Sequence, residues 1–392
     1  MIIVVTGCGI KNVETDEKMQ GDSFETEEKI FANEDTITEN NENEIAYETW
    51  IANDWEEDES AVGYNLGNRA ISTEGNGCIY TRDMGLYGGK SEEEGECYSI
   101  YRLKNEKWEL FVSHPITEED SWTVEEKRLY NLTYYKGYIY YILLRDSEVG
   151  MGHSGKDYSI CRASEEDGTV EELVKCNGNF FIYQDEIYYE TLENSNRWYF
   201  RMKLDGSDRQ LIYFDDPKDY RQFTYTVGGG CLYLKKEERI MGISLETGKI
   251  KFFETFATNI DGIFYERGNL YLVDNVNDVI YQLDARTGNE TKILELEGHF
   301  EWGSLWIHNG CLYYVEWEPE SEENCRDFKV LDLTTGEIIT WNIVSFDNAR
   351  MSTHLEVVGN HILIRFIIWN ENDTAYEYGY FEKEISEMIE TE

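Results

Sequence analysis

The sequence predicts an all-β protein, a seven-bladed β-propeller of four-stranded antiparallel blades preceded by a disordered acidic tether. Three observations predict this fold. Aromatic residues make up 14% of the 392 residues, with 29 Tyr, and such side chains favour a pleated sheet. A short motif recurs seven times along the chain. Each clear copy is followed by a pattern of two strands joined by a glycine-containing turn. These patterns fall between about residues 62 and 388, which we assign to one propeller domain.

The recurring motif is a small or turn-forming residue, any residue, an aliphatic residue and then usually Tyr. The spacing between successive copies of the motif is typical of the repeats of propellers and solenoids. The seven copies are GCIY (77–80), GYIY (137–140), DEIY (185–188), GCLY (230–233), GNLY (268–271), GCLY (310–313) and the degenerate NHIL (360–363).

Each motif is followed by a predicted hairpin. The clearest is RMKLDGSDRQLIYF (201–214), and later copies carry Thr-Gly in the turn, as in MGISLETGKIKFF (241–253). Glycine at these positions supplies the positive φ that a tight hairpin needs. A weaker strand precedes the motif, as in NFFI (179–182). Each unit therefore predicts a four-stranded meander, and closing seven units into a ring limits exposed strand edges.

The charge of the chain restricts its partners. Lys and Arg number 35 and Asp and Glu 79, which gives a formal net charge of −44. The negative electrostatic field of a chain with this charge repels nucleic-acid phosphates and anionic lipid surfaces. We therefore expect no nucleic-acid binding, and cationic or neutral partners.

The eight cysteines do not indicate a disulfide framework. Cys78, Cys231 and Cys311 occupy one position of the repeat, so they should lie far apart, and we expect them to be small buried apolar residues. Cys97, Cys161, Cys176 and Cys325 show no CxxC spacing, which makes a zinc site improbable.

The first residues resemble a lipoprotein signal. Val5-Thr6-Gly7-Cys8 is similar to a bacterial lipobox, in which the cysteine sulfur receives a diacylglycerol group. We interpret residues 1–8 as the remnant of such a signal, Cys8 as the lipidated residue and residues 9–60 as an acidic flexible tether. Only seven residues precede Cys8, fewer than a working signal needs. The alternative is a short N-terminal strand with a buried cysteine.

Residues 62–83 (VGYNLGNRAISTEGNGCIYTRD) and 199–211 (YFRMKLDGSDRQL) resemble a family of uncharacterised seven-bladed propeller lipoproteins of Clostridia-like Gram-positive bacteria. The likeness extends over about residues 62–388. One repeat here keeps the full Asp-Gly-Ser turn of that family. The resemblance implies a propeller anchored outside the cell and implies no activity.

The sequence shows no recognisable catalytic constellation, and we expect no enzyme activity, no metal and no cofactor. GHSG (152–155) lacks the spacing and context of an esterase serine, so we expect a Gly-rich loop there. SEEDGTV (164–170) is interpreted as a hairpin turn, and DNVND (274–278) as an Asn/Asp turn and not a calcium loop. His299 and His308 are expected on successive strands.

Loop lengths indicate where a ligand could bind. Four predicted connections between second and third strands are long: residues 84–96, 145–157, 317–325 and 368–374. They belong to repeats one, two, six and seven, which become neighbours when the ring closes, and the segment 114–127 opens on the same side. Binding residues concentrate on loops held by rigid scaffolds. The candidate ligand-binding residues are Tyr87, Trp122, His153, Trp317 and Trp369. Unselected loop lengthening is the alternative explanation.

The leading hypothesis is a surface-anchored, non-enzymatic propeller that binds an extracellular peptide, protein or glycan. We expect a monomer that meets the membrane only through Cys8. The rivals are a propeller enzyme acting on cell-wall or dietary glycan, and a scaffold subunit of a surface complex.

Overall fold

The protein is described by a computed structural model, and the text below concerns the residues that the structure describes: 62–63, 71–82, 97–104, 107–115, 129–149, 153–193, 196–215, 225–317, 326–344, 350–369 and 376–384. Within these ranges all regular structure is strand, as the sequence predicts. Cys8, the predicted tether, Tyr87 and Trp122 lie outside them. No helix in the described part of the chain is long and apolar enough to cross a membrane.

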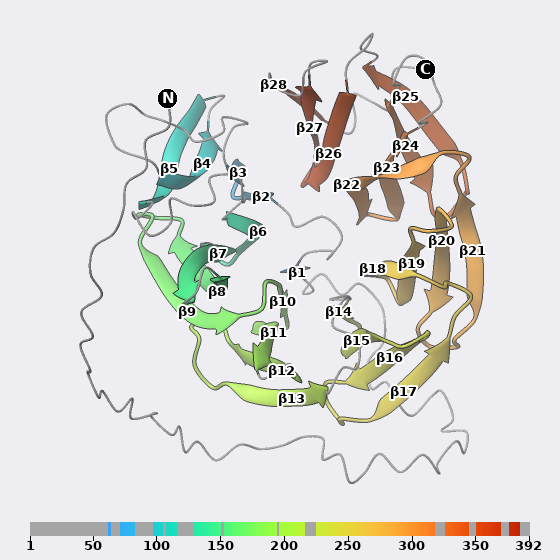
Figure 1. Cartoon of the computed structure of the whole chain (residues 1–392), viewed down its shortest axis with the longest axis horizontal. Coiled ribbons are helices and arrows are strands. Elements are labelled where there is room, and N and C mark those ends of the chain that lie inside the picture. The colour runs from blue at the N-terminus through green and yellow to red at the C-terminus, as the bar shows by residue number, and fades with distance from the viewer. Residues whose placement is uncertain are drawn as a thin grey trace, which may run out of the picture.

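Seven sheets stand around a common axis, and each blade runs from its innermost strand outward (Figure 1). Blade 1 contains β2 (Ser72–Gly75), β3 (Cys78–Arg82), β4 (Cys97–Lys104) and β5 (Lys107–Pro115). Blade 2 contains β6 (Leu129–Tyr135), β7 (Tyr138–Val149), β8 (His153–Ser164) and β9 (Val170–Cys176). Blade 3 contains β10 (Phe180–Tyr183), β11 (Glu186–Glu193), β12 (Asn196–Lys203) and β13 (Gln210–Asp215).

Blades 4 to 7 repeat the same order. Blade 4 contains β14 (Tyr225–Gly228), β15 (Cys231–Lys236), β16 (Arg239–Ser244) and β17 (Ile250–Glu254). Blade 5 contains β18 (Ile260–Glu266), β19 (Asn269–Asp274), β20 (Val279–Asp284) and β21 (Glu290–Glu295). Blade 6 contains β22 (His299–His308), β23 (Cys311–Trp317), β24 (Arg326–Asp332) and β25 (Ile338–Val344), and the described strands of blade 7 are β26 (Arg350–Val358), β27 (His361–Trp369) and β28 (Tyr376–Glu384).

Turn chemistry explains the repeat. The glycines predicted to allow tight hairpins between third and fourth strands have positive φ, namely 82° at Gly206, 67° at Gly248, 77° at Gly288 and 75° at Gly336. An L-residue with a Cβ atom is disfavoured in this left-handed region. The recurring motif therefore marks the turn between the first and second strands of a blade, and the glycine-containing hairpin marks the turn between the third and fourth strands. The predicted meander is confirmed.

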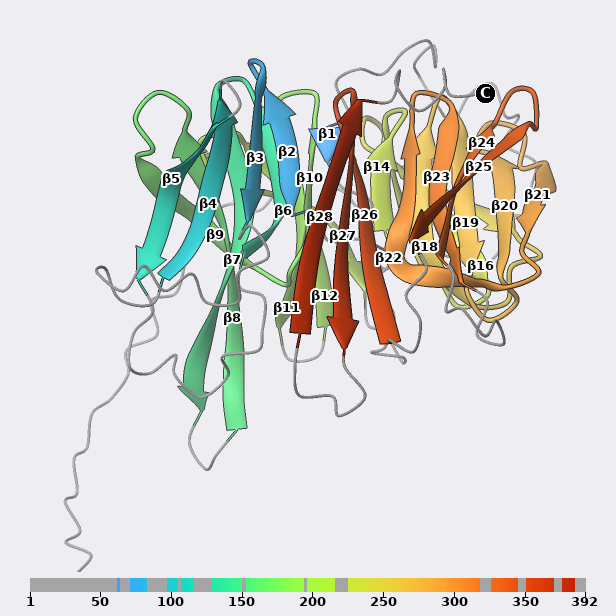
Figure 2. The same cartoon turned by 90° about the horizontal axis from the view of Figure 1, so that it is seen from above.

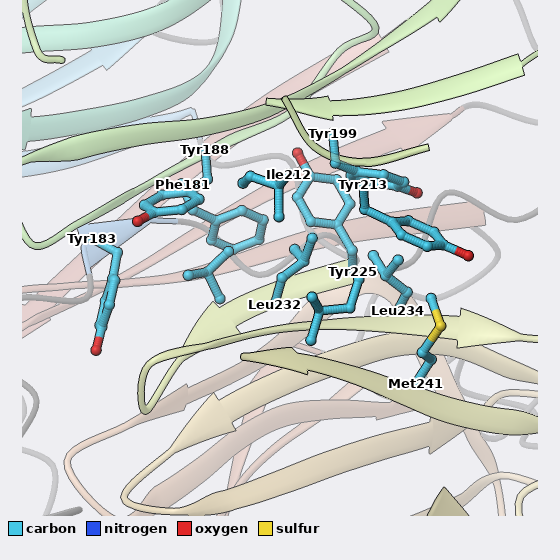
Figure 3. Close-up of a cluster of buried hydrophobic side chains, with 12 residues drawn as sticks. Phe181, Tyr183, Tyr188, Tyr199, Ile212, Tyr213, Tyr225, Leu232, Leu234 and Met241 are labelled. Atoms are coloured by element: carbon cyan, nitrogen blue, oxygen red, sulfur yellow. The ribbon is translucent and has the colours of Figure 1, made fainter. Parts of the chain in front are cut away.

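Aromatic and aliphatic side chains fill the spaces between blades. Between blades 3 and 4 the cluster combines Tyr and Phe rings from β10 to β14 with aliphatic residues of β15 and β16 (Figure 3). The rings of Phe181 and Tyr225 meet edge-on with their centroids 5.1 Å apart. Such packing explains the abundance of Tyr, because a ring fills the wedge between twisted sheets and keeps its hydroxyl group available for a hydrogen bond.

Glycine also permits close contact between successive inner strands. A Cβ atom on Gly75 would lie 2.1 Å from the ring of Tyr134, and one on Gly228 would lie 2.0 Å from the ring of Tyr265. In both cases a Tyr of the next blade lies flat on the last residue of an inner strand. A side chain at either position would therefore force the two blades apart.

The ring closes between blade 7 and blade 1, which lie side by side in Figure 1. Ile79 of blade 1 packs against Val358 and Leu363 of blade 7, with Leu103 and Trp108 around them. Across the same boundary the backbone N–H of Ile71 donates to Oε1 of Glu356 at 2.6 Å. Among the described residues, every strand of blade 1 comes from residues 72–115 and every strand of blade 7 comes from residues 350–384.

A short strand from before blade 1 lies at the centre of the ring. β1 (Val62–Gly63) pairs antiparallel with the inner edge of β10, so the sheet of blade 3 has five strands. Figure 1 places it near the axis. The propeller therefore uses its own chain to cover one inner strand edge.

One predicted loop is a hairpin. Residues 145–157 were expected to form a long loop, but β7 continues to Val149 and β8 begins at His153, with pairing from Arg145–Asp157 to Val149–His153. Figure 2 shows this hairpin projecting beyond the ring. The expectation of a Gly-rich loop at GHSG is wrong for His153 to Gly155, which lie in β8. Cross-strand backbone bonds that extend the blade replace the predicted loop.

The repeat cysteines begin equivalent strands and are free thiols. Cys78, Cys231 and Cys311 are the first residues of β3, β15 and β23. Cys78 and Cys231 are buried, as predicted, whereas Cys311 is partly exposed. Burial raises the pKa of the Cys231 thiol to about 12, so this cysteine is a small neutral core residue.

Candidate functional site

We define the loop face as the face of the ring at which the second strand of each blade ends and the third begins. The connections from one blade to the next open on the same face because they follow the fourth strand, which is antiparallel to the third. The projecting β7–β8 hairpin extends from this face (Figure 2). The loop face is therefore where the sequence places its candidate binding residues.

Three of the five candidates fall on described backbone at the loop face. Trp317 ends β23, Trp369 ends β27 and His153 begins β8. Trp317 and Trp369 are thus in adjacent blades, and His153 is at the tip of the projecting hairpin of blade 2. Of these three residues, the structure describes the side chain of Trp317 only.

Trp317 lies beside His299, the first residue of β22. Their ring centroids are 6.2 Å apart and the ring planes are inclined by 49°. The side chain of His299 is 55% exposed. The expectation that His299 and His308 lie on successive strands is wrong, since both are on β22, one at each end. A bulge lengthens this inner strand between Phe300 and Leu305, so one strand spans what the pattern suggested were two.

Asp278 holds His299 in place. Oδ2 of Asp278 is 2.7 Å from Nδ1 of His299, and Oδ1 accepts the backbone N–H of Phe300 at 3.1 Å. Because a carboxylate only accepts hydrogen bonds, Nδ1 carries the proton. The remaining ring nitrogen, Nε2, is then the atom of this exposed imidazole that is available to a ligand.

Glu316 bonds the backbone at Gly298, the residue before His299. It is buried next to Trp317 on β23. Its Oε1 accepts the backbone N–H of Gly298 at 3.1 Å, and its Oε2 forms an ion pair with Lys329. Both oxygens are thereby engaged, which offsets the cost of burying this charge.

The DNVND segment is a hydrogen-bonded turn, as predicted. Oδ2 of the buried Asp274 accepts the backbone N–H of Thr258 at 2.7 Å, and its Oδ1 accepts that of Asn277 at 3.2 Å. Nδ2 of Asn259 donates to Oδ1 of Asn275 at 2.7 Å. Burial acts to raise the pKa of Asp274, but the hydrogen bonds from Asn277 and Thr258 outweigh it and hold the pKa below its ordinary value.

The arrangement combines a rigid polar frame with an exposed imidazole and a neighbouring indole. In the part of the chain that the structure describes, no group of three or more His, Cys, Asp or Glu residues is placed to hold a metal ion. Asp274, Asp278 and Glu316 accept hydrogen bonds from neighbouring backbone N–H groups and so hold the loops in position. The geometry is suited to holding a ligand on its surface.

Trp317 is among the candidate binding residues named from the sequence, whereas the residues around it are not. Asp278 and His299 are 21 residues apart and lie in neighbouring blades, so no local spacing reveals the pair. The short loop of blade 5 is not among the long loops that the sequence analysis selects, although it carries Asp274 and Asp278. The one usable signal was the density of Asp, Asn and Thr in residues 255–261 and 274–278, which is typical of side chains that bond to backbone.

A second buried polar group lies in blade 3. Glu190 on β11 is fully buried, and its Oε1 accepts Nδ2 of Asn177 at 3.1 Å. Burial raises the pKa of Glu190 to about 7, against the opposing effects of the Arg197 charge and of hydrogen bonds from Asn177 and Tyr199. A carboxyl group in this setting takes up a proton near neutral pH.

The fold and the loop face define a β-propeller. No protein-family model matches the chain, and no curated protein matches it. Among solved structures, it is similar to a chain of the nidogen/laminin complex, with a TM-score of 0.37, 14% identity and coverage of 64% of this chain and 90% of that one. It is also similar to TolB from Acinetobacter baumannii, with a TM-score of 0.39, 14% identity and coverage of 73% and 77%. These likenesses assign no function to the chain.

Proposed function

We propose that the protein is a non-enzymatic binding propeller that recognises an extracellular peptide, protein or glycan with its loop face. The observation that carries the proposal is the pairing of Trp317 with the exposed His299 on a hydrogen-bonded frame. An indole face and an imidazole nitrogen offer apolar contact and one directed hydrogen bond, the combination typical of ligand sites.

The acidic residues of the proposed site serve as a frame for the two rings. A catalytic carboxylate must be able to reach a substrate atom within hydrogen-bond distance. Asp278 and Glu316 instead accept backbone N–H groups and hold His299 and Lys329. Their role in the proposed function is to keep the two rings in a fixed position, which reduces the entropy lost when a ligand binds.

The proposed setting is the outer face of the cytoplasmic membrane, with Cys8 as the lipid anchor and residues 9–60 as the spacer. The lipobox-like Val5-Thr6-Gly7-Cys8 and the acidic stretch that follows it support this setting. Metabolic labelling of the full-length protein with a palmitate analogue in its native host should give a labelled band that Cys8→Ser abolishes. Equal labelling of the variant would refute the anchor without affecting the loop-face proposal.

Ligand recognition can be tested with glycan and peptide arrays probed by the fluorescently labelled full chain. We expect Trp317→Ala and His299→Ala each to weaken binding to the best array ligand by about tenfold, the scale at which central contact residues act. His308→Ala is the matched control, because His308 lies at the opposite end of the same strand. If His299→Ala and His308→Ala bound equally well, the loop-face site would be wrong.

A further inference from the structure

Two strongly exposed apolar side chains lie on connections of the loop face, and one of these connections also carries Asp278, the partner of His299. Phe256, in the connection from blade 4 to blade 5, is 73% exposed, and Val276, in the DNVND turn of blade 5, is 67% exposed. They are the two most exposed large hydrophobic residues in the described part of the chain. Single exposed apolar residues are common on protein surfaces, but these two are on loops that are bonded to each other.

The loops that carry them are rigid. Oε2 of Glu290 accepts the backbone N–H of Phe256 at 2.6 Å, and its Oε1 accepts the hydroxyl of Thr255 at 2.5 Å. Asn277 donates from Nδ2 to Oγ1 of Thr258 at 2.9 Å, which ties the second loop to the first. Phe256 and Val276 are therefore held in place before a partner arrives, and little backbone entropy is lost on binding.

The charge around the pair is mainly negative, although Nη1 of Arg239 lies 3.9 Å from Oε1 of Glu254. Residues 254–261 and 274–278 contain four carboxylates and no Lys or Arg: Glu254, Asp261, Asp274 and Asp278. Lys235 reaches this region by donating from Nζ to the carbonyl oxygen of Ile260 at 3.3 Å. With a chain of net charge −44, the local field favours a cationic partner and opposes a second copy of the same chain.

We propose that Phe256 and Val276 form a docking platform for a basic peptide segment of a partner protein, a segment in which Lys or Arg alternates with apolar residues. The inference rests on the proposed binding function and adds the class of partner. A Lys or Arg of the segment lies over the ring of Phe256 as a cation–π contact, and a neighbouring apolar side chain packs on Val276. The surrounding carboxylates speed association and set specificity against acidic segments.

The test measures binding of the full chain to a fluorescein-labelled peptide that alternates Lys with Leu, by fluorescence anisotropy at physiological salt. We expect the double variant Phe256→Ala/Val276→Ser to weaken binding by about tenfold, as loss of a central apolar contact does. A peptide with Glu in place of Lys should not bind measurably. Thermal unfolding of each variant checks that the fold is retained.

The matched control is Phe252→Ala/Ile338→Ser, which removes an exposed Phe and an exposed aliphatic residue from outer strands. Phe252 is 39% exposed on β17 and Ile338 is 47% exposed on β25. This control should bind the Lys–Leu peptide as the wild type does. Equal weakening in both double variants would show a general electrostatic attraction and overturn the proposal, as would unchanged binding by the Phe256/Val276 variant.

Two further measurements distinguish a peptide partner from a second copy of the chain, and the Phe256/Val276 platform from the Trp317 site. If sedimentation showed a dimer that Phe256→Ala/Val276→Ser dissolves, the platform would be a self-contact and the proposal would be wrong. If Trp317→Ala lost its array ligand while the Phe256/Val276 variant kept the Lys–Leu peptide, the binding function would stand and the platform would fail. If instead the Phe256/Val276 variant lost the Lys–Leu peptide while Trp317→Ala kept its array ligand, the platform would be supported and the Trp317 site would be rejected.

Discussion

Glu190 places an ionisable group in the interior of blade 3. Its pKa is about 7 in the folded chain, compared with an ordinary value of 4.5, because burial disfavours the charged form. Between these two pH values the folded protein holds a proton that the unfolded chain has released. The group therefore contributes stability that is fully present below pH 4.5 and is lost as the pH rises through 7.

The Glu190→Gln variant tests this linkage, since Gln keeps an oxygen for Asn177 but does not ionise. The shift of the pKa corresponds to about 3 kcal/mol. We expect the free energy of unfolding to fall between pH 4.5 and pH 8 by about that much less in the variant than in the wild type. Urea denaturation at the two pH values measures the free energy of unfolding of both proteins. All other carboxylates are the same in both, so the difference between the two pH dependences reports on Glu190. Parallel pH profiles would contradict the assignment.

The turn at residues 274–278 shows how one buried side chain organises an element. Asp274 accepts backbone N–H groups from its own turn and from the preceding inter-blade connection. Two loops of different blades are thus joined through one carboxylate. Since a buried donor that loses its acceptor costs about 1–3 kcal/mol, the rigidity of the loop face depends on this residue.

Replacing Asp274 by Ala should release both loops without unfolding the ring. We expect faster amide hydrogen exchange at Thr258 and Asn277, by about tenfold or more, because their acceptor is gone. Asp284→Ala is the matched control: Asp284 accepts the N–H groups of Arg286 and Thr287 in an exposed turn of the same blade. Unchanged exchange at Thr258 in the Asp274 variant would show that the loops are held by other contacts.

The ring as a whole is closed by contacts between its first and last blades. Among the side chains that the structure describes, Ile79, Val358 and Leu363 form a buried cluster between blades 7 and 1. The boundary between the first and last blades is the one boundary without a covalent link along the chain. It is therefore the place where the molecule should open first.

We expect Leu363→Ala to open this boundary locally. Loss of a buried Leu costs about 2–5 kcal/mol, and here the cost falls on the boundary that no link along the chain joins. Hydrogen exchange should increase in β2, β3, β26 and β27 while β14 to β16 stay protected. Leu232→Ala, at an equally buried position between blades 3 and 4, is the control and should show exchange through global unfolding. Identical exchange patterns in the two variants would argue against a weak boundary.

Much of the fold could be predicted because its signals are local. A hairpin turn with positive φ needs glycine within a few residues of the strands it joins, so Gly206 and Gly288 mark their turns in the sequence itself. The long β7–β8 hairpin was mistaken for a loop, since its Gly and charged residues suggest irregular structure while its cross-strand bonds favour strand. Tertiary pairing overrode a weak local preference.

The candidate site was only partly predictable. The position of Trp317 at the loop face could be predicted because it ends a recognisable strand. Its contact with His299, and the bond from Asp278 to that imidazole, join residues of two blades. Such contacts depend on how far each blade is rotated relative to the next, and no spacing along the chain encodes that rotation.

The sequence by itself determined the repeat, the turns, the all-β composition and the acidic field, because each depends on single residues or on neighbours along the chain. Only the tertiary structure decided which side chains meet across blades, that β1 covers an inner edge of blade 3, and that the frame of the loop face lies at blades 5 and 6. The physical reason is that burial and hydrogen bonding between blades arise from ring closure, which brings together residues that the chain keeps apart.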